Sequence, residues 1–477
     1  MTPTLRPRPR LLYLLSFWPR RAHSAASERI FCNWHHFKNG GYDVVLAADG
    51  PVPEDWDQDP GAYTPPTDVQ RPPMVRLKTN DPDGIKKLHA IEPQVVLFDK
   101  YTTEEKYSWQ VCRGAPEALR ILDTVDLHWL RKGRDALCKK GAYFLPHFEK
   151  IDTDPEFFAS LSQVIEASGD HFLREMAAIL RSDLTLVVSD VEKKILSSWN
   201  FISPEQVVLQ TLGQAIFSPQ QTADSKDHSC HDKRQDFYFV GHYHHPPNRD
   251  AIAWLKSVLW PMIRAQFIAH GLESRSPEMP RMHIFSAGMT PSQRQSLDHR
   301  NSGFWVHGPV EKIPLNTLRV NLAPLRSGAG IKGKIAEGWS WGLPVVTTPV
   351  GAEGMFLSES KQDSSVFGGL IAQDEADFAR KAHFLYTDPH LWQSCQRAGQ
   401  KTLETKFCPL RNQQVLLDVT ASLLRDLPVW RRRHLLSSLL AHESLRSTEY
   451  FSRWIQLKNE LRPQENSIPL NLRDRIP

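Results

Sequence analysis

Short apolar runs alternate with amphipathic stretches along most of the chain. Parallel strands that are covered on both faces lack the polar–apolar alternation of a half-exposed sheet, so such runs are typical of them. The runs are Leu11–Leu15, Val44–Ala48, Val95–Phe98, Arg120–Leu122 and Leu184–Val188, then Phe237–Val240, Met282–Phe285, Phe304–Val306, Leu318–Leu322 and Pro344–Thr348. Strands that alternate with helical sequence predict an α/β fold with right-handed crossovers.

Local signals place helices between these strands. Residues 157–181 have helical sequence. Ser189 and Glu192 have the spacing of a capping box, and Asn248 is a candidate helix cap. A polar segment, 218–234, interrupts the rhythm, which predicts a linker between two doubly wound domains, 1–217 and 235–427. Residues 428–477 form a predicted helical tail with basic residues near Trp430, for which packing on the first domain is favoured over contact with an anionic membrane surface.

The amino terminus has two interpretations. Arginines precede Leu11–Leu15, and a run of small residues follows at 22–26, as in a cleavable targeting peptide. The same apolar run, ended by Pro19, is also typical of a first buried strand. The strand is favoured, and with it a cytoplasmic location, although cleavage of residues 1–26 is left open.

Composition narrows the function classes. The 477 residues carry 58 Lys and Arg against 54 Asp and Glu, a net charge of +4, which gives no indication of nucleic acid binding. Six scattered cysteines indicate reduced thiols rather than a disulfide scaffold. No apolar run approaches the roughly 18 residues of a membrane span. The histidines near Cys230 and His242 lack the spacing of a zinc site, so no metal is expected.

The most informative segment is 323–337, which lies between a predicted strand and a predicted helix. Gly328 and Gly330 let the backbone approach a ligand closely. The free N–H groups of a helix start favour an anion, and Arg326, Lys332 and Lys334 add positive charge there. This pattern predicts a phosphate or diphosphate cradle. A second glycine-rich loop, 342–354, follows, and both loops are at carboxyl ends of predicted parallel strands, where open α/β sheets bind ligands.

Residues 321–355 closely resemble the donor-binding segment of the group-one glycosyl transferases, a retaining family with the GT-B fold. The motifs that carry the resemblance are P-L-R-x-G-x-G-I-K-x-K-I-x-E and G-L-P-V-V-T-T-x-x-G-A-E-G. Weaker similarity covers most of residues 10–425. The resemblance implies two Rossmann-like domains that face each other across a cleft, and a hexosyltransferase-type role in glycan biosynthesis. The implied partners are a nucleotide sugar and an unidentified glycan, lipid or small-molecule acceptor, with no further cofactor.

The resemblance also implies roles for individual residues. Glu337 matches the second glutamate of the family's E-x7-E motif, which holds the nucleotide ribose. Lys332 would face the diphosphate and stabilise the leaving group. Asp126 or His128 would assist the acceptor hydroxyl. The remaining implied donor-binding residues are Gly241, Val310, Arg326, Gly328, Gly330, Gly351 and Glu353.

The chain departs from the family pattern at several points. The first glutamate of the motif is replaced by Ala329, and the usual paired glycines after the first strand by Ala25 and Ala26. The loop 241–248 lacks the family's arginine and lysine. These departures keep two alternatives open, namely a non-catalytic GT-B-like scaffold or subunit and a nucleotide-sugar epimerase. They also leave the donor sugar and the retaining outcome undecided.

Overall fold

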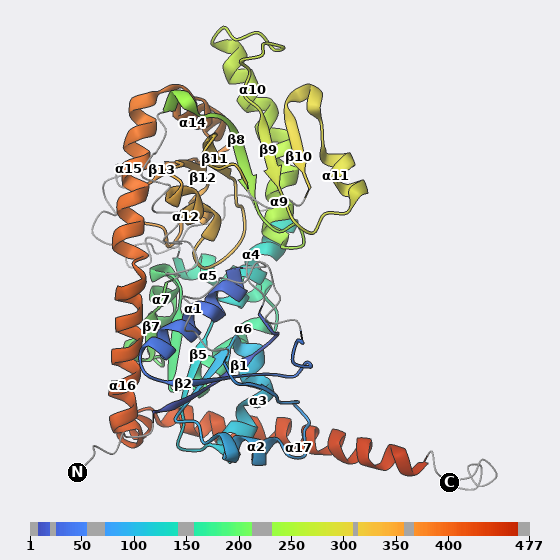
Figure 1. The fold of residues 1–477 in the computed structure, drawn as a ribbon, viewed down its shortest axis with the longest axis vertical. Helices are drawn as coiled ribbons and strands as arrows, with labels where there is room; N and C mark the ends of the chain where they lie inside the picture. Colours follow the sequence, from blue (N-terminus) through green and yellow to red (C-terminus); the bar gives the residue numbers. More distant parts are fainter. Residues whose placement is uncertain are drawn as a thin grey trace, which may run out of the picture.

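The computed structural model describes residues 8–19, 25–54, 72–141, 157–211, 231–308, 313–356 and 367–465. These residues form two parallel sheets, each between layers of helices, stacked one above the other in Figure 1. The first sheet has the strand order β3-β2-β1-β4-β5-β6-β7 and the second β10-β9-β8-β11-β12-β13. In each sheet the strands are added first on one side of the domain's first strand (β1 or β8) and then on its other side. This reversal of direction confirms two doubly wound domains.

The first sheet lies in the amino-terminal domain. Its strands are β1 (Arg10–Leu15), β2 (Asp43–Ala48), β3 (Met74–Arg76), β4 (Val95–Asp99), β5 (Leu119–Asp123), β6 (Leu184–Val187) and β7 (Val207–Leu209). The helices are α1 (Ala25–Asn39), α2 (Gly84–Ile91), α3 (Tyr101–Gly114), α4 (His128–Lys139), α5 (Phe157–Ala167), α6 (His171–Arg181) and α7 (Asp190–Ser197). β1 pairs with both β2 and β4, so the favoured strand interpretation of Leu11–Leu15 is confirmed.

The second sheet contains β8 (Gln235–Val240), β9 (Met282–Phe285), β10 (Phe304–His307), β11 (Leu318–Ala323), β12 (Val345–Thr347) and β13 (Gly369–Ile371). Its helices are α9 (Pro246–Trp254), α10 (Trp260–Ala269), α11 (Pro291–Leu297), α12 (Gly333–Ser340), α13 (Pro349–Ala352), α14 (Glu375–Thr387) and α15 (Pro389–Lys406). A π-helical turn, Leu255–Leu259, joins α9 to α10.

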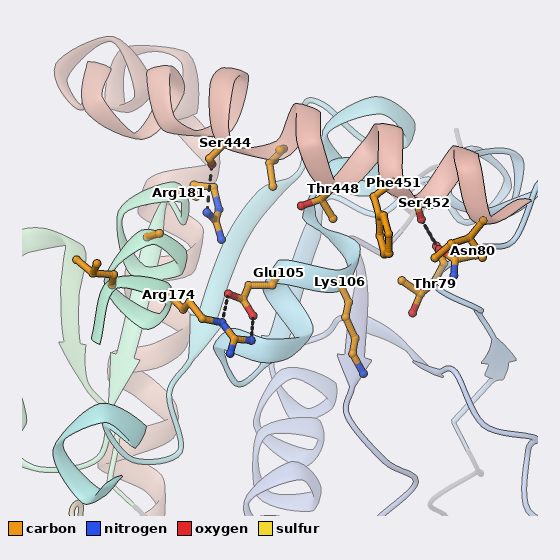
Figure 2. A pocket seen from close by; sticks show the side chains of 14 residues that line it. Thr79, Asn80, Glu105, Lys106, Arg174, Arg181, Ser444, Thr448, Phe451 and Ser452 are labelled. Atoms are coloured by element: carbon orange, nitrogen blue, oxygen red, sulfur yellow. Dashed lines mark hydrogen bonds and ion pairs between the residues drawn. The ribbon is translucent and has the colours of Figure 1, made fainter. Parts of the chain in front are cut away.

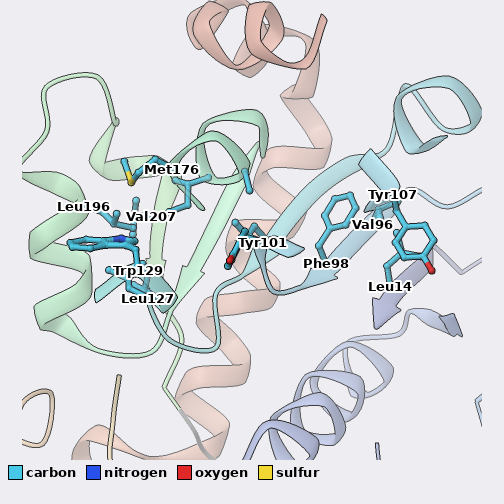
Figure 3. Packing of buried hydrophobic residues seen from close by; sticks show 14 of the residues in the cluster. Leu14, Val96, Phe98, Tyr101, Tyr107, Leu127, Trp129, Met176, Leu196 and Val207 are labelled. Atoms are coloured by element: carbon cyan, nitrogen blue, oxygen red, sulfur yellow. The ribbon is translucent and has the colours of Figure 1, made fainter. Parts of the chain in front are cut away.

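Apolar side chains pack on both faces of the first sheet. Alternate side chains of β1, Leu12 and Leu14, face a core shared with α3, α4, α6 and α7, part of which Figure 3 shows around Phe98 and Trp129. The intervening side chains of β1 face α1 and the buried leucines of α16 (Pro409–Arg433), such as Leu416. Burial on both faces explains why these strands read as continuous apolar runs.

The chain returns to the first domain earlier than predicted. α16 packs on α1, and α17 (Leu435–Glu465) packs on α3 and α6, as the long red helices of Figure 1 show. The second domain therefore ends near Lys406, about twenty residues before the predicted boundary at 427. The tail is packed on the first domain, which is the interpretation that the sequence favoured.

Three local expectations are corrected. Residues 157–181 form two helices, because Gly169 adopts a positive φ of 63° that ends α5. Asn248 is not the helix cap: α9 begins at Pro246, and the Asn248 amide donates to the carbonyl of His242 instead. The capping box is half formed, since Ser189 accepts from the Glu192 N–H while the Glu192 carboxylate turns to other backbone donors.

Candidate donor and acceptor site

The predicted cradle lies between β11 and α12, at the carboxyl edge of the second sheet. α12 begins at Gly333, so the lysine-rich turn does lead into a helix start. Gly328 and Gly330 have φ values of 132° and 65°, a region that side chains rarely adopt. The loop therefore needs both glycines for its conformation.

These glycines also let the first domain approach the loop. A Cβ added at Gly330 would lie 2.9 Å from a methyl of Val188 and 3.2 Å from the Cβ of Asp126. A Cβ added at Gly354, in the second glycine-rich loop, would lie 2.7 Å from the Cβ of Ser189. Both loops of the second domain thus lie directly against the first domain, and larger residues at these glycines would push the domains apart.

Arg134 of α4 is the central contact between the domains. Its guanidinium is fully buried and donates to both carboxylate oxygens of Glu353, at 2.7 Å each. It also donates to the carbonyl of Gly328 at 2.8 Å. Bidentate charge-assisted hydrogen bonds of this kind are among the strong ones in proteins. One first-domain arginine therefore joins the cradle to the second glycine-rich loop.

Two further contacts from α4 close the same interface. The Ser327 hydroxyl donates to the Asp135 carboxylate, and the Cys138 thiol donates to the carbonyl of Arg326 at 3.2 Å. His128, Arg131, Asp135 and Cys138 follow one another at intervals of three or four residues, so they share one face of the helix. That face covers the cradle in this structure.

Lys332 lies at the centre of the charges that meet here. Its ammonium group is buried and donates to the carbonyls of Gly330 at 2.7 Å and Ala329 at 3.4 Å. Burial lowers the pKa of Lys332 to about 8, although the carboxylates of Glu353, Glu192 and Asp126 act in the opposite direction. A lysine kept in this environment gains from any added negative charge.

Lys334 and Glu337 form the outer side of the cradle on α12. The Lys334 ammonium donates to the Asn248 side chain and lies 4.3 Å from the centre of the Phe239 ring. Burial, with Lys332 nearby, lowers the pKa of Lys334 to about 7. Burial raises the pKa of Glu337, which Lys334 partly offsets. Burial therefore shifts the pKa of each of these three groups toward its neutral form.

The loop after β8 completes this side. Gly241 is needed for a close approach, since a Cβ there would lie 2.6 Å from the Asn248 amide nitrogen. Asn248 in turn links the loop to Lys334. The loop's His245 is close enough to Asp126 and Arg131 for their charges to influence it, and burial lowers its pKa to about 4.

Asp126 and His128 face this loop from the first domain. His128 Nε2 lies 3.2 Å from one Asp126 oxygen, and Arg131 donates to the other at 2.7 Å. Burial raises the pKa of Asp126, but Arg131 and His128 outweigh it and bring it to about 2. Burial lowers the pKa of His128 to about 4. At neutral pH the pair is an ionised aspartate beside a neutral imidazole.

The backbone at this pair is unusual. Val125 has a φ of 64°, which is strained for a β-branched residue, and its N–H donates to Asp123. The next turn is held by buried carboxylates from other helices: Glu192 accepts from the N–H of Leu127, and Glu175 from that of Trp129. Burial raises the pKa of Glu192 to about 7. These contacts fix Asp126 and His128 at the domain interface.

The other predicted residues are distributed as follows. Arg326 is engaged by Asp250 and lies over the Trp254 ring, so a phosphate contact would require it to leave this ion pair. Gly351 packs α13 onto the sheet, where a Cβ would lie 1.9 Å from the Thr347 hydroxyl oxygen. Val310 lies outside the described residues. Arg131 and Arg134 were not predicted, although they follow His128 at successive intervals of three residues and so lie about one turn apart on α4.

A separate groove of about 530 Å³ lies far from the cradle. Figure 2 shows it between α3, α6 and α17, with Glu105, Arg174 and Phe451 among its lining side chains. Two of its charged groups are paired with each other, as Arg174 donates to both oxygens of Glu105. Within the described ranges, no three His, Cys, Asp or Glu side chains are arranged to hold a metal ion, and no helix is long and apolar enough to cross a membrane.

Comparisons with known proteins agree with this architecture. Solved structures that match include sucrose-phosphate synthase from Thermosynechococcus elongatus, with a TM-score of 0.56, 13% identity, and coverage of 88% of this chain and 100% of that one. Alr3699/HepE from Anabaena in complex with UDP matches with a TM-score of 0.52 and 10% identity over 87% and 100%. A glycosyltransferase from Rickettsia africae matches with 0.53 and 11% over 88% and 99%. These likenesses establish the GT-B fold.

The sequence of the second domain matches a family profile. Residues 234–388 match the profile described as "Glycosyl transferases group 1". The second domain thus resembles the group 1 glycosyl transferases over residues 234–388, and the whole chain has the GT-B fold of the matching structures. No curated protein sequence matches the chain.

The contact of Arg134 with Glu353 predicts strong coupling between these two residues. Arg134→Ala should destabilise the protein by about 3–5 kcal/mol, because it leaves a buried carboxylate unpaired. Adding Glu353→Ala should recover part of that loss, with a coupling energy of about 0.5–3 kcal/mol. Urea unfolding of the two single variants and the double variant measures this. Strictly additive losses would contradict the contact.

Proposed function

We propose that this protein transfers a sugar from a nucleoside-diphosphate sugar to an acceptor hydroxyl, with retention of configuration. The observation that carries the proposal is the pair of lysines, Lys332 and Lys334, at the start of α12 beside a glycine-rich loop. Burial lowers the pKa of both side chains, so an added anion would stabilise the charged form of each. A diphosphate at this helix start would supply the missing charge.

Donor entry requires the domains to separate at the cradle. In the described arrangement α4 covers the loop, and Arg134 occupies the space between Gly328 and Glu353. We infer that the diphosphate takes the place of the Glu353 carboxylate on Arg134, since both are anions with oxygen pairs that fit a guanidinium. Glu353 is then released toward the hydroxyls of the donor sugar, the role that its position in the motif implies. Reclosure excludes water and limits donor hydrolysis.

The chemical step in this proposal is the departure of the nucleoside diphosphate. As its bond to the sugar stretches, negative charge grows on the β-phosphate. Lys332, Arg134 and the start of α12 stabilise that charge without reorganising. Glu337, one turn further along α12, faces the ribose. No metal is assigned a role, because these groups supply the positive charge.

The acceptor hydroxyl is assigned to the first domain, next to Asp126 and His128. The Nε2 atom of His128 lies 3.2 Å from the ionised Asp126, so a proton on Nε2 would face that carboxylate and leave the other ring nitrogen as the proton acceptor. A carboxylate that fixes the tautomer of a histidine base is a common arrangement. His128 would take the hydroxyl proton directly or pass it to the departing phosphate.

The comparisons supply the donor class with which to begin. Alr3699/HepE was crystallised with UDP and with UDP-glucose, which makes UDP the first nucleotide to test. The sugar and the acceptor are not proposed. A scaffold role or an epimerase activity would be indicated by the absence of nucleotide binding, or by diphosphate release that does not depend on an acceptor.

Loss of Lys332 or Glu337 should weaken nucleotide binding without unfolding the protein. Calorimetric titration with UDP, GDP and ADP should show at least a tenfold weaker Kd for Lys332→Ala and for Glu337→Ala with the preferred nucleotide, since each removes a charge-assisted hydrogen bond worth about 1.5–3 kcal/mol. Lys381→Ala on α14 is the matched control and should bind normally. Unchanged binding in both site variants would remove this site.

Nucleotide binding should weaken as pH rises from 7 to 9. In the free protein Lys334 and Lys332 lose their protons near pH 7 and 8, and a bound diphosphate raises both pKa values again. Binding above these values takes up protons, so Kd should rise by up to about tenfold per pH unit for each lysine involved. Titrations at four pH values test this, and a flat profile would contradict it. Lys332→Ala should show a shallower slope.

Removal of the proposed base should slow transfer but spare donor binding. His128→Ala should lower acceptor-dependent diphosphate release by about 10²- to 10⁴-fold, the usual contribution of a general base. The Kd for the nucleotide should stay within twofold of the parent value. His89→Ala, an exposed histidine on α2, is the control. Normal turnover in His128→Ala would assign the proton transfer to another group.

A further inference from the structure

The inner face of the carboxyl-terminal helix α17 is packed against the first domain. It lies along the end of the first domain that is remote from the second (Figure 1) and packs on α3 and α6. Leu445 is buried, the Ser444 hydroxyl accepts from Arg181, and the Ser452 hydroxyl donates to Thr79 and Asn80, contacts visible in Figure 2. One side of the helix is therefore fixed to the protein.

The outer face of α17 is apolar and exposed. Six large side chains on it have exposed fractions of 42–67%. They are Leu436, Leu439, Tyr450, Trp454, Leu457 and Leu461. Glu443 and Arg446 lie between Leu439 and Tyr450 on the same face. Together the eight positions follow one another at intervals of three or four residues, so they form one stripe that is apolar at both ends and charged in the middle. A contiguous exposed stripe of this kind marks an interaction surface.

The charges along the helix do not fit an anionic lipid surface. Interfacial helices combine an apolar face with a polar face rich in Lys and Arg. Residues 435–461 carry three basic side chains (Arg446, Arg453, Lys458) against three acidic ones (Glu443, Glu449, Glu460). The polar face is packed on the protein, and Glu443 lies within the stripe, where it would enter the lipid. The surface is better suited to a protein helix.

We propose that two copies of this chain pair through α17, antiparallel and about a two-fold axis near Thr448. The stripe has the symmetry that such a pairing needs, since its members lie at mirror positions on either side of that residue. Leu436 then lies level with the partner's Leu461, and Leu439 with the partner's Leu457. A two-fold interface uses the same patch on both subunits, which a symmetric stripe satisfies.

The charged positions also match in this register. Glu443 lies level with the partner's Trp454 and near the partner's Lys458, so a carboxylate within the stripe gains a cationic neighbour, while Arg453 is already paired with Glu449. Lys458 already lies over the Trp454 ring, with its nitrogen 5.0 Å from the ring centre. Arg446 lies level with the partner's Tyr450, a cation–π arrangement. The interface is at the opposite end of the first domain from the cradle (Figure 1), so the pairing covers neither cradle.

Sedimentation equilibrium tests the pairing. The parent protein should show twice the 54.6 kDa chain mass at micromolar concentration, and Leu439→Glu with Leu457→Glu should weaken association at least 100-fold. Leu410→Glu, an exposed leucine on α16, is the control and should stay dimeric. Glu443→Lys should also dissociate the dimer, and Lys458→Glu added to it should restore association.

A cysteine probe tests the antiparallel register without removing apolar contacts. Ser447→Cys places two thiols near the axis and should form a disulfide-linked dimer under mild oxidation. Leu457→Cys places them roughly 26 Å apart along the helix axis, at 1.5 Å per residue, and should not. A monomeric parent, or cross-linking through Leu457→Cys alone, would overturn the proposal. So would a monomer that binds vesicles of phosphatidylserine and phosphatidylcholine and loses that binding in Leu439→Glu.

Discussion

The buried guanidinium of Arg134 is the contact on which the arrangement of this enzyme depends. It is the point where the first domain holds both glycine-rich loops of the second, through Gly328 and Glu353. A fully buried charge is tolerated only when it is paired and hydrogen-bonded, so the closed state is well defined. In the proposed function the donor diphosphate takes the place of Glu353 on Arg134. Closing and donor binding would then compete for one group, which would couple sugar transfer to domain movement.

The glycines illustrate how one sequence feature serves two purposes. Gly330 was expected to let a ligand approach the backbone, and its positive φ is consistent with that. In the closed state the neighbouring atoms belong to Val188 and Asp126 of the first domain. Because Gly330 has no side chain, the backbone of the loop can be approached closely by the first domain and, in the proposed function, by the donor. Lys332 and Lys334, buried beside it with lowered pKa values, give the loop its preference for an anion.

Much of the fold could be predicted because its strands are buried on both faces. Runs such as Leu11–Leu15 and Phe237–Val240 have no competing helical period, and they form β1 and β8. The short strands β3, β7 and β13 were missed, whereas β12, which has the same length, was found because it lies within a longer apolar run. The loop between β11 and α12 could be placed from its glycines and lysines. Arg134 could not, because its partners are about two hundred residues away and its helix has no distinctive motif.

The account is tested most directly by hydrogen exchange with and without saturating UDP. If the diphosphate binds at the cradle and displaces Glu353 from Arg134, exchange should slow in residues 326–340 and change in α4, while α17 is unaffected. Protection confined to the groove between α3, α6 and α17, or no change in 326–340, would contradict a donor site at this loop.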